Sequence, residues 1–172
     1  VLETSGLADP AAILSLIQGH PILARQIVVA EIVVIVDALN ARDQVQQESL
    51  SRKQIEAADR LVLTKTDVAQ ADDTARLRAT LASIAPGASQ FGALFGSDVT
   101  LPDHDMKAAP YSLAGQSEVP IHASRLELGP NADWTAFTVW LSALLYARGD
   151  QIVRVKGVVQ TQAGRVLVQA VR

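Results

Sequence analysis

The seven residues Leu-Val-Leu-Thr-Lys-Thr-Asp, numbers 61–67, set the architecture that we expect for this chain. Three apolar residues run directly into a polar loop, which predicts a short buried strand with Thr64, Lys65 and Asp67 at its carboxyl end. Open parallel α/β sheets bind their ligands at the carboxyl ends of the strands. We therefore place a candidate binding loop at the end of this strand.

The loop has the chemistry to read a guanine base. The carboxylate of Asp67 can accept two hydrogen bonds from the N1–H and the amino group of guanine, whereas adenine offers no such pair of donors on that edge. The methylene stem of Lys65 can lie along the face of the purine. A Lys-x-Asp loop after a strand is also found as an ordinary charged turn, so support must come from a second segment.

That second segment is ETSGLADP, residues 3–10. It predicts the end of a strand at Leu2, a tight loop around Gly6, and a helix that begins with Asp9-Pro10 as N-cap and first residue. Gly6 can bring its N–H to a phosphate with no side chain in the way, and Glu3 can face a hydrated Mg²⁺. The alternative is a loop that only caps a helix.

Four blocks of this sequence, in this order, resemble the CobW family of P-loop GTPases, which are associated with cobalamin synthesis and with zinc or cobalt delivery. The blocks are ETSGLADP at 3–10, IVVIVDALN at 32–40, ADRLVLTKTD at 58–67 and IVRVKGVV at 152–159. The resemblance covers nearly the whole chain. It implies a partial GTPase-type α/β domain followed by a small C-terminal domain.

The resemblance also implies roles for single residues. Glu3 would organise the magnesium-bound water or the switch loop, Gly6 would touch the γ-phosphate, and Lys65 with Asp67 would select guanine. The usual guanine motif begins with Asn where this chain has Thr64, which keeps a hydroxyl but lacks the amide that ties the loop to the phosphate loop. This departure allows looser selectivity, so GTP is the first choice and ATP the alternative.

Two motifs of the family are absent from these residues: the Gly-rich phosphate loop that ends in Gly-Lys-Thr/Ser, and the Cys-x-Cys-Cys metal motif. Without the phosphate loop, the charge that develops during phosphoryl transfer is left unstabilised. We expect these 172 residues to be part of a longer protein and to be catalytically inactive alone. The expected cofactors are GTP and Mg²⁺, with Zn²⁺ or Co²⁺ implied only for that parent, and the expected partner is a metal-receiving client protein.

Composition narrows the function classes. A net charge of −3 with 49% apolar residues suits a soluble globular domain with a small second unit, and is not basic enough for a nucleic-acid surface. No apolar run has the length of a membrane span and no signal peptide is present, so a cytoplasmic location is the default expectation. The absence of cysteine excludes disulfides, and the oligomeric state is not predicted.

Strands and helices are expected to alternate up to about residue 99. The run IVVIV at 32–36 is typical of a strand covered by helices on both faces, and it ends in Asp37. Asp37 either contacts a ligand or its magnesium water, or caps the following turn. Helices are expected over 10–26 with a break at 19–21, over 47–58, and after an N-cap at Asp72 or Asp73. This alternation predicts a parallel three-layer α/β sheet.

The expected domain boundaries are a partial GTPase domain at 1–112, a linker at 113–120 and a CobW-like C-terminal domain at 121–172. Asp103-His104-Asp105 lies shortly before the linker and can be read as part of a labile metal site or as a solvated acidic turn. The acidic turn is favoured because no cysteine or second histidine is near. No metal site is therefore assigned to these residues.

The C-terminal part predicts a βαββ order, which makes a small α+β domain. Arg154 and Lys156 fall on one face of their strand. They are either exposed charges opposite a buried stripe or, in a second reading, a contact for an anion or a partner protein. A rival function follows from the second reading: a non-catalytic partner-binding module. The elements of this domain are a strand at 121–128, a helix capped by Asn131 or Asp133, and strands at 152–159 and 165–171.

Overall fold

The computed structural model describes residues 1–92, 108–113, 124–129, 133–152, 154–162 and 164–171. The chain divides into two compact units, Val1–Ala123 and Ser124–Arg172, which are taken separately below. The predicted linker, apart from residue 113, and the Asp103-His104-Asp105 turn lie outside the described residues. The boundaries expected from the sequence stay predictions.

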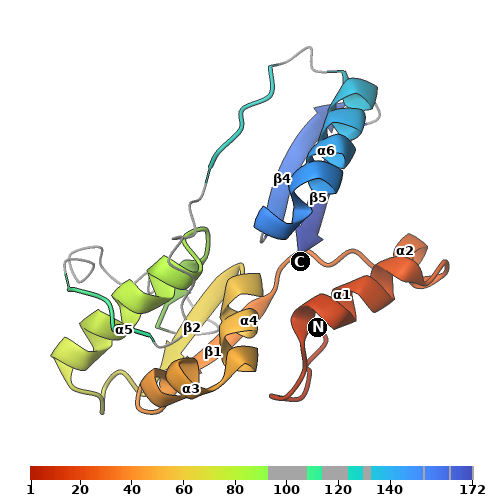
Figure 1. Ribbon diagram of the computed structural model, residues 1–172. Helices are drawn as coiled ribbons and strands as arrows, with labels where there is room; N and C mark the ends of the chain where they lie inside the picture. The colour runs from red at the N-terminus through yellow and green to blue at the C-terminus, as the bar shows by residue number, and fades with distance from the viewer. Residues whose placement is uncertain (93–107, 114–123, 130–132, 153, 163, 172) are drawn as a thin grey trace. The chain divides into compact units, whose positions relative to one another are not determined.

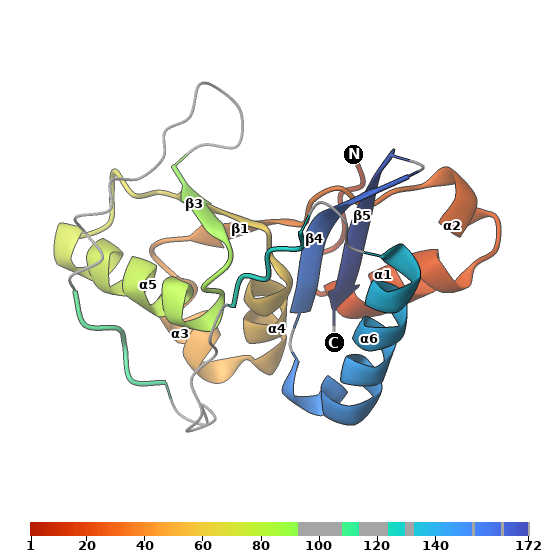
Figure 2. The same ribbon diagram turned by 90° about the horizontal axis from the view of Figure 1, so that it is seen from above.

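The first unit is built on a parallel sheet of three strands in the order β1-β2-β3; β1 and β2 are labelled in Figure 1 and β3 in Figure 2. β1 (Val33–Asp37) and β2 (Arg60–Thr64) pair along their whole length, and β3 (Ser89–Phe91) pairs with Arg60–Val62 of β2. The β-branched run of β1 and the leucine-rich run of β2 form strands because such side chains pack well on a buried, pleated sheet surface. The expected parallel α/β fold is confirmed.

Five helices connect or precede these strands. Their bounds are α1 (Pro10–Gly19), α2 (Leu23–Gln26), α3 (Ala41–Gln47), α4 (Ser49–Ala57) and α5 (Ala71–Ile84). The carboxylate of Asp9 caps α1, as expected, by accepting a hydrogen bond from the N–H of Ala11 at 2.9 Å. The predicted cap of α5 was wrong. Gln70 is its N-cap, and Asp72 and Asp73 lie in the first turn, where negative charge is favoured by the helix dipole.

The core of this unit lies on one face of the sheet. Leu61 and Leu63 of β2 are 0% exposed and pack in one cluster with residues of α3, α4 and α5, and Figure 2 shows these three helices on the same side of the strands. The other face of β1 is open in the described residues, with Ile35 60% exposed. The expectation that helices cover both faces of β1 was therefore wrong for this part of the chain.

The strand expected at Leu2 is not present. Residues 1–5 have no regular secondary structure, and Leu2 is 71% exposed. No described strand pairs with this segment, so no sheet hydrogen bonds repay the cost of ordering its backbone. The segment from Glu3 onward keeps the expected tight turn, in which the N–H of Ala8 donates to the C=O of Ser5 at 2.9 Å.

The second unit contains α6 (Trp134–Arg148), a short 3₁₀ helix η2 (Gly149–Gln151), and the antiparallel strands β4 (Arg154–Thr161) and β5 (Gly164–Val171). Asp133 caps α6, as expected, by accepting from the N–H of Thr135 at 2.7 Å. Gly164 has φ +116°, which the turn between the strands requires and which glycine supplies at low cost.

The first strand expected for the second unit was not found at 124–128, because this segment has no strand partner. Its residues 121–123 lie outside the described part. Lys156 is exposed as expected, whereas Arg154 is half-buried.

None of the described helices combines the length and the apolar character that crossing a bilayer requires.

Candidate functional site

The carboxyl ends of β1 and β2 lie side by side and form the base of the candidate site. Asp37 pairs in register with Thr64, and the N–H of Ala38 donates to the C=O of Thr64 at 3.0 Å, which extends the pairing by one residue. The Thr64 hydroxyl also donates to the C=O of Val36 at 3.4 Å. The two loops that leave these strands therefore start from fixed positions.

Lys65 begins the loop after β2 with an unusual backbone. Its φ is +58°, the left-handed region that residues with a side chain seldom adopt, and its C=O accepts hydrogen bonds from the N–H groups of Val68 and Ala69 at 3.2 and 3.1 Å. The side chain turns toward β1, where its Nζ lies 2.7 Å from Oδ2 of Asp37. The lysine side chain thus spans the ends of two strands.

The Asp37 carboxylate is held by three donors. Besides Lys65, the N–H of Leu39 donates to Oδ1 at 3.0 Å and the side-chain amide of Asn40 donates to Oδ2 at 2.8 Å. The hydrogen bond from Lys65, followed by that from Leu39, lowers the pKa of Asp37 below its ordinary value of 3.8. Asp37 caps the turn after β1, one of the two roles expected, and also holds the lysine of the candidate loop.

The lowered pKa gives a direct test of the pair. We expect the Asp37 carboxyl group to titrate below 3.8, and Lys65→Ala to raise its pKa toward that value because the donor with the largest effect is lost. The stabilisation from the ionised carboxylate is then present above pH 3.8 and is lost as the pH falls through the lower folded value. Carbon-13 NMR of the carboxyl groups measures both values. An unchanged pKa in Lys65→Ala would contradict the pairing.

Asp67 is exposed on the same loop. In the part of the chain that the structure describes, its carboxylate has no hydrogen-bond or ion-pair partner, so both oxygens remain available to a ligand. Thr64, Lys65 and Asp67 are therefore brought together at one edge of the sheet, as the sequence predicted from their spacing.

The Gly6 loop is attached to α4 rather than to the β2 loop. The side-chain amide of Gln54 donates to the C=O groups of Gly6 and Ala8, both at 2.9 Å, and Lys53 lies 3.8 Å from the carboxylate of Asp9. Glu3 is exposed. Among the described residues, no hydrogen bond or ion pair joins this loop to Thr64–Asp67. The two predicted halves of the site are therefore held by different elements, the Gly6 loop by α4 and the Thr64–Asp67 loop by the end of β1.

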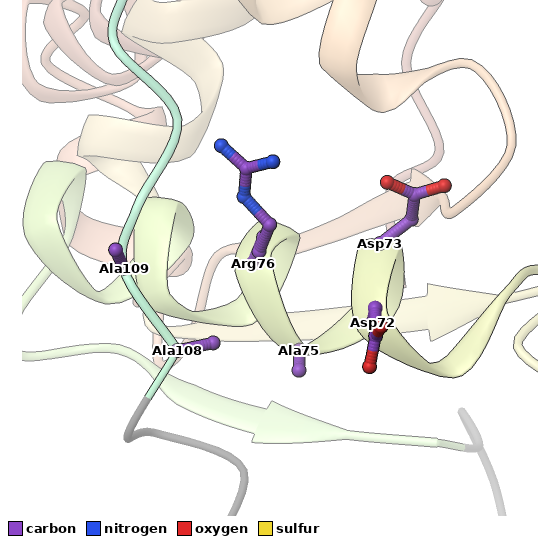
Figure 3. A pocket seen from close by; sticks show the side chains of 6 residues that line it. All are labelled: Asp72, Asp73, Ala75, Arg76, Ala108 and Ala109. Atoms are coloured by element: carbon purple, nitrogen blue, oxygen red, sulfur yellow. The ribbon is translucent and has the colours of Figure 1, made fainter.

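A pocket lined by no residue of either loop lies between α5 and the segment 108–109 (Figure 3). It exists because Tyr111 fixes that segment: its N–H donates to the hydroxyl of Thr80 at 2.8 Å and its own hydroxyl donates to Asp73 at 3.1 Å. Burial, followed by the bond to Asp73, raises the pKa of Tyr111 above its ordinary 10.0. The contacts that form the pocket are thus those that fasten the chain to α5. Its lining residues are Asp72, Asp73, Ala75, Arg76, Ala108 and Ala109.

Two family models match the chain. The model described as CobW/HypB/UreG, nucleotide-binding domain, matches residues 1–91, more than half of the chain, and includes both loops of the candidate site. The model of the cobalamin synthesis protein CobW C-terminal domain matches residues 117–172. The chain belongs to the CobW family.

A curated relative and two solved structures are similar to this CobW-family chain. The zinc chaperone YjiA of Escherichia coli (strain K12) is 27% identical over 183 residues, which cover 100% of this chain and 58% of the relative. The crystal structure of the Zn(II)-bound YjiA GTPase from E. coli has a TM-score of 0.58 at 24% identity, and covers 96% of this chain and 56% of that one. The crystal structure of a Zn(II)-bound triple mutant of the YjiA GTPase has a TM-score of 0.58 at 26% sequence identity, and likewise covers 96% of this chain and 56% of that one.

The chain therefore spans little more than half the length of the relatives that it matches. Among its described residues, no three histidine, cysteine, aspartate or glutamate side chains are grouped so that they could hold a metal ion. In its described part, the two loops of this CobW-family chain carry two exposed carboxylates without a hydrogen-bond or ion-pair partner, those of Glu3 and Asp67.

Proposed function

We propose that this chain is part of a GTP-binding and GTP-hydrolysing protein that delivers a metal ion, with zinc as the first choice. The observation that carries the proposal is the loop Thr64–Asp67 at the carboxyl end of β2, with a free aspartate and a lysine fixed across the strand ends. The match to the nucleotide-binding domain of the family and the similarity to a zinc chaperone support it. Cobalt delivery and cobalamin synthesis are the alternatives that the family leaves open.

In this proposal each site residue has one task. Asp67 accepts two hydrogen bonds from guanine, the stem of Lys65 covers the purine face, and Thr64 fixes the start of the loop through its bond to Val36. Gly6 offers its N–H to the γ-phosphate. These assignments remain predictions for the longer parent, which must supply the phosphate loop before hydrolysis can occur.

The chemistry of Glu3 fits a position beside a nucleotide-bound Mg²⁺. Mg²⁺ in nucleotide sites keeps several waters and uses one or two carboxylates together with the phosphates, and Glu3 is an exposed carboxylate without a partner among the described residues. Glu3 would hold one of the metal-bound waters. Bound Mg²⁺ would neutralise charge on the phosphates. The metal that is delivered would pass to a client protein, and a cytoplasmic location remains the expectation for the parent.

Calorimetric titration of the full-length protein with GTP and with ATP, each with Mg²⁺, tests the proposal. We expect saturable GTP binding that is tighter than ATP binding, and GTP hydrolysis that responds to Zn²⁺. Absence of saturable GTP binding would overturn the proposal. Tighter binding of ATP than of GTP would replace GTP by ATP in the assignment and remove the guanine-reading role of Asp67.

A second function, a partner-binding module, is favoured by the surface of α6. This helix has no buried residue, and it exposes Trp140 and Val139 together with Tyr146, which is 95% exposed. Val139 and Tyr146 are seven residues apart and therefore lie on one face of the helix, and exposed large apolar side chains that share a face are typical of protein contact surfaces. Nucleotide titration separates the two functions, because the partner-binding module alone requires no GTP.

A further inference from the structure

We propose that Asp37 is a positioning residue for base recognition: it fixes the Lys65 ammonium so that the lysine stem lies across the ends of β1 and β2 as an apolar strip for a purine. The inference rests on the proposed nucleotide function and adds to it a residue outside the loop that reads the base. It predicts that the ligand class of this edge of the sheet is a purine nucleotide.

The direction of the lysine side chain supports this assignment. Lys65 leaves the end of β2, and its ammonium is found 2.7 Å from a carboxylate at the end of β1. Neighbouring strands are about 4.8 Å apart, so the four methylene groups must bridge that spacing along the sheet edge. The lysine side chain is still 53% exposed, which leaves the stem accessible to a flat ligand while its charge is neutralised.

The anchor is itself fixed. Asp37 cannot turn away easily, because the backbone N–H of Leu39 holds its Oδ1; the exposed amide of Asn40 donates only to Oδ2, where water can replace it. An unpaired lysine side chain samples many rotamers, and ordering them on binding weakens affinity. Asp37 removes much of that freedom before the base arrives, so its effect should appear in ligand affinity and should depend on the presence of Lys65.

The backbone of Lys65 points to the same function. A φ of +58° is unfavourable for lysine and ordinary for glycine, yet the chain places a long cationic side chain there. A turn alone requires only the backbone conformation. A lysine at this position is explained if its side chain, which extends to Asp37, contacts a ligand.

A double-mutant cycle in the full-length protein tests the proposal with GTP as the probe. We expect Asp37→Asn, which keeps the shape of the side chain and an acceptor for Leu39, to weaken GTP binding about 5-fold, and Lys65→Ala to weaken it about 10-fold. The double variant should bind no more weakly than Lys65→Ala alone. Losses that multiply, or an unchanged affinity in Asp37→Asn, would overturn the proposal.

Asn40→Ala is the matched control. It removes another partner of the Asp37 carboxylate but leaves the ion pair with Lys65, so GTP affinity should stay within about twofold. A loss as large as that of Asp37→Asn would mean that Asp37 acts only by capping the turn, which would overturn the inference. If the unmodified protein fails to bind GTP, the proposed function itself fails. If it binds GTP and Asp67→Ala weakens binding while Asp37→Asn does not, only the positioning role fails.

Discussion

Replacement of Asp67 by alanine should weaken GTP binding by the full-length protein about 100-fold and leave ATP binding nearly unchanged. The carboxylate is expected to accept two hydrogen bonds from guanine, and bonds to a charged group contribute about 1.5–3 kcal/mol each. A total of about 3 kcal/mol corresponds to two factors of ten in affinity. Adenine presents no such pair of donors, so its binding does not depend on this side chain. Calorimetric titration with both nucleotides measures the change.

Asp72→Ala provides a control for the loss of one negative charge. Asp72 is also exposed, and it lies in the first turn of α5, five residues beyond Asp67. Its replacement should change GTP affinity by less than about twofold, since an exposed charge outside the site interacts weakly through water. A GTP preference that survives in Asp67→Ala would count decisively against guanine recognition by this loop.

Leu63→Ala should lower the free energy of unfolding by about 2–5 kcal/mol, the range observed when a buried leucine is truncated and a cavity remains. Leu63 is 0% exposed and lies in the cluster that joins β2 to the helices of the first unit. Urea denaturation followed by circular dichroism measures the difference. The loss should appear with or without nucleotide, because the side chain faces the core and not the candidate site.

Ile35→Ala is the matched control on the neighbouring strand. Ile35 is 60% exposed and pairs in register with Val62, so its truncation removes a similar number of methyl groups with little loss of packing in the described structure. We expect a change below about 1 kcal/mol. Equal destabilisation by the two substitutions would contradict the one-sided core, and would indicate that something covers the open face of β1.

Local chemistry explains which features could be predicted from the sequence. The buried strand at Leu61–Leu63 follows from an apolar run that ends in polar residues, and the caps of α1 and α6 follow from Asp9 and Asp133. In each of these cases the signal lies within a few residues of its effect. The same holds for Thr64, Lys65 and Asp67, which lie within four consecutive residues and consequently share one loop.

The features that the sequence did not predict depend on residues far apart in the chain. The pair of Lys65 with Asp37 joins positions 28 residues apart, and the contact of Gln54 with Gly6 joins positions 48 apart. Periodicity and turn propensities carry no information about such pairs. The strand expected at Leu2, and the described part 124–128 of the strand expected at 121–128, are not formed for a related reason, since a strand requires a partner that local sequence does not reveal.

The left-handed backbone at Lys65 has a consequence for engineering. Glycine is the residue that best tolerates this conformation, so a campaign that selects variants for heat resistance would tend to enrich glycine at position 65. Each such variant would have less backbone strain in the turn and would lose the side chain that reaches Asp37. Selection for robustness alone would therefore erode ligand recognition at this position first, and library designs should keep Lys65 fixed.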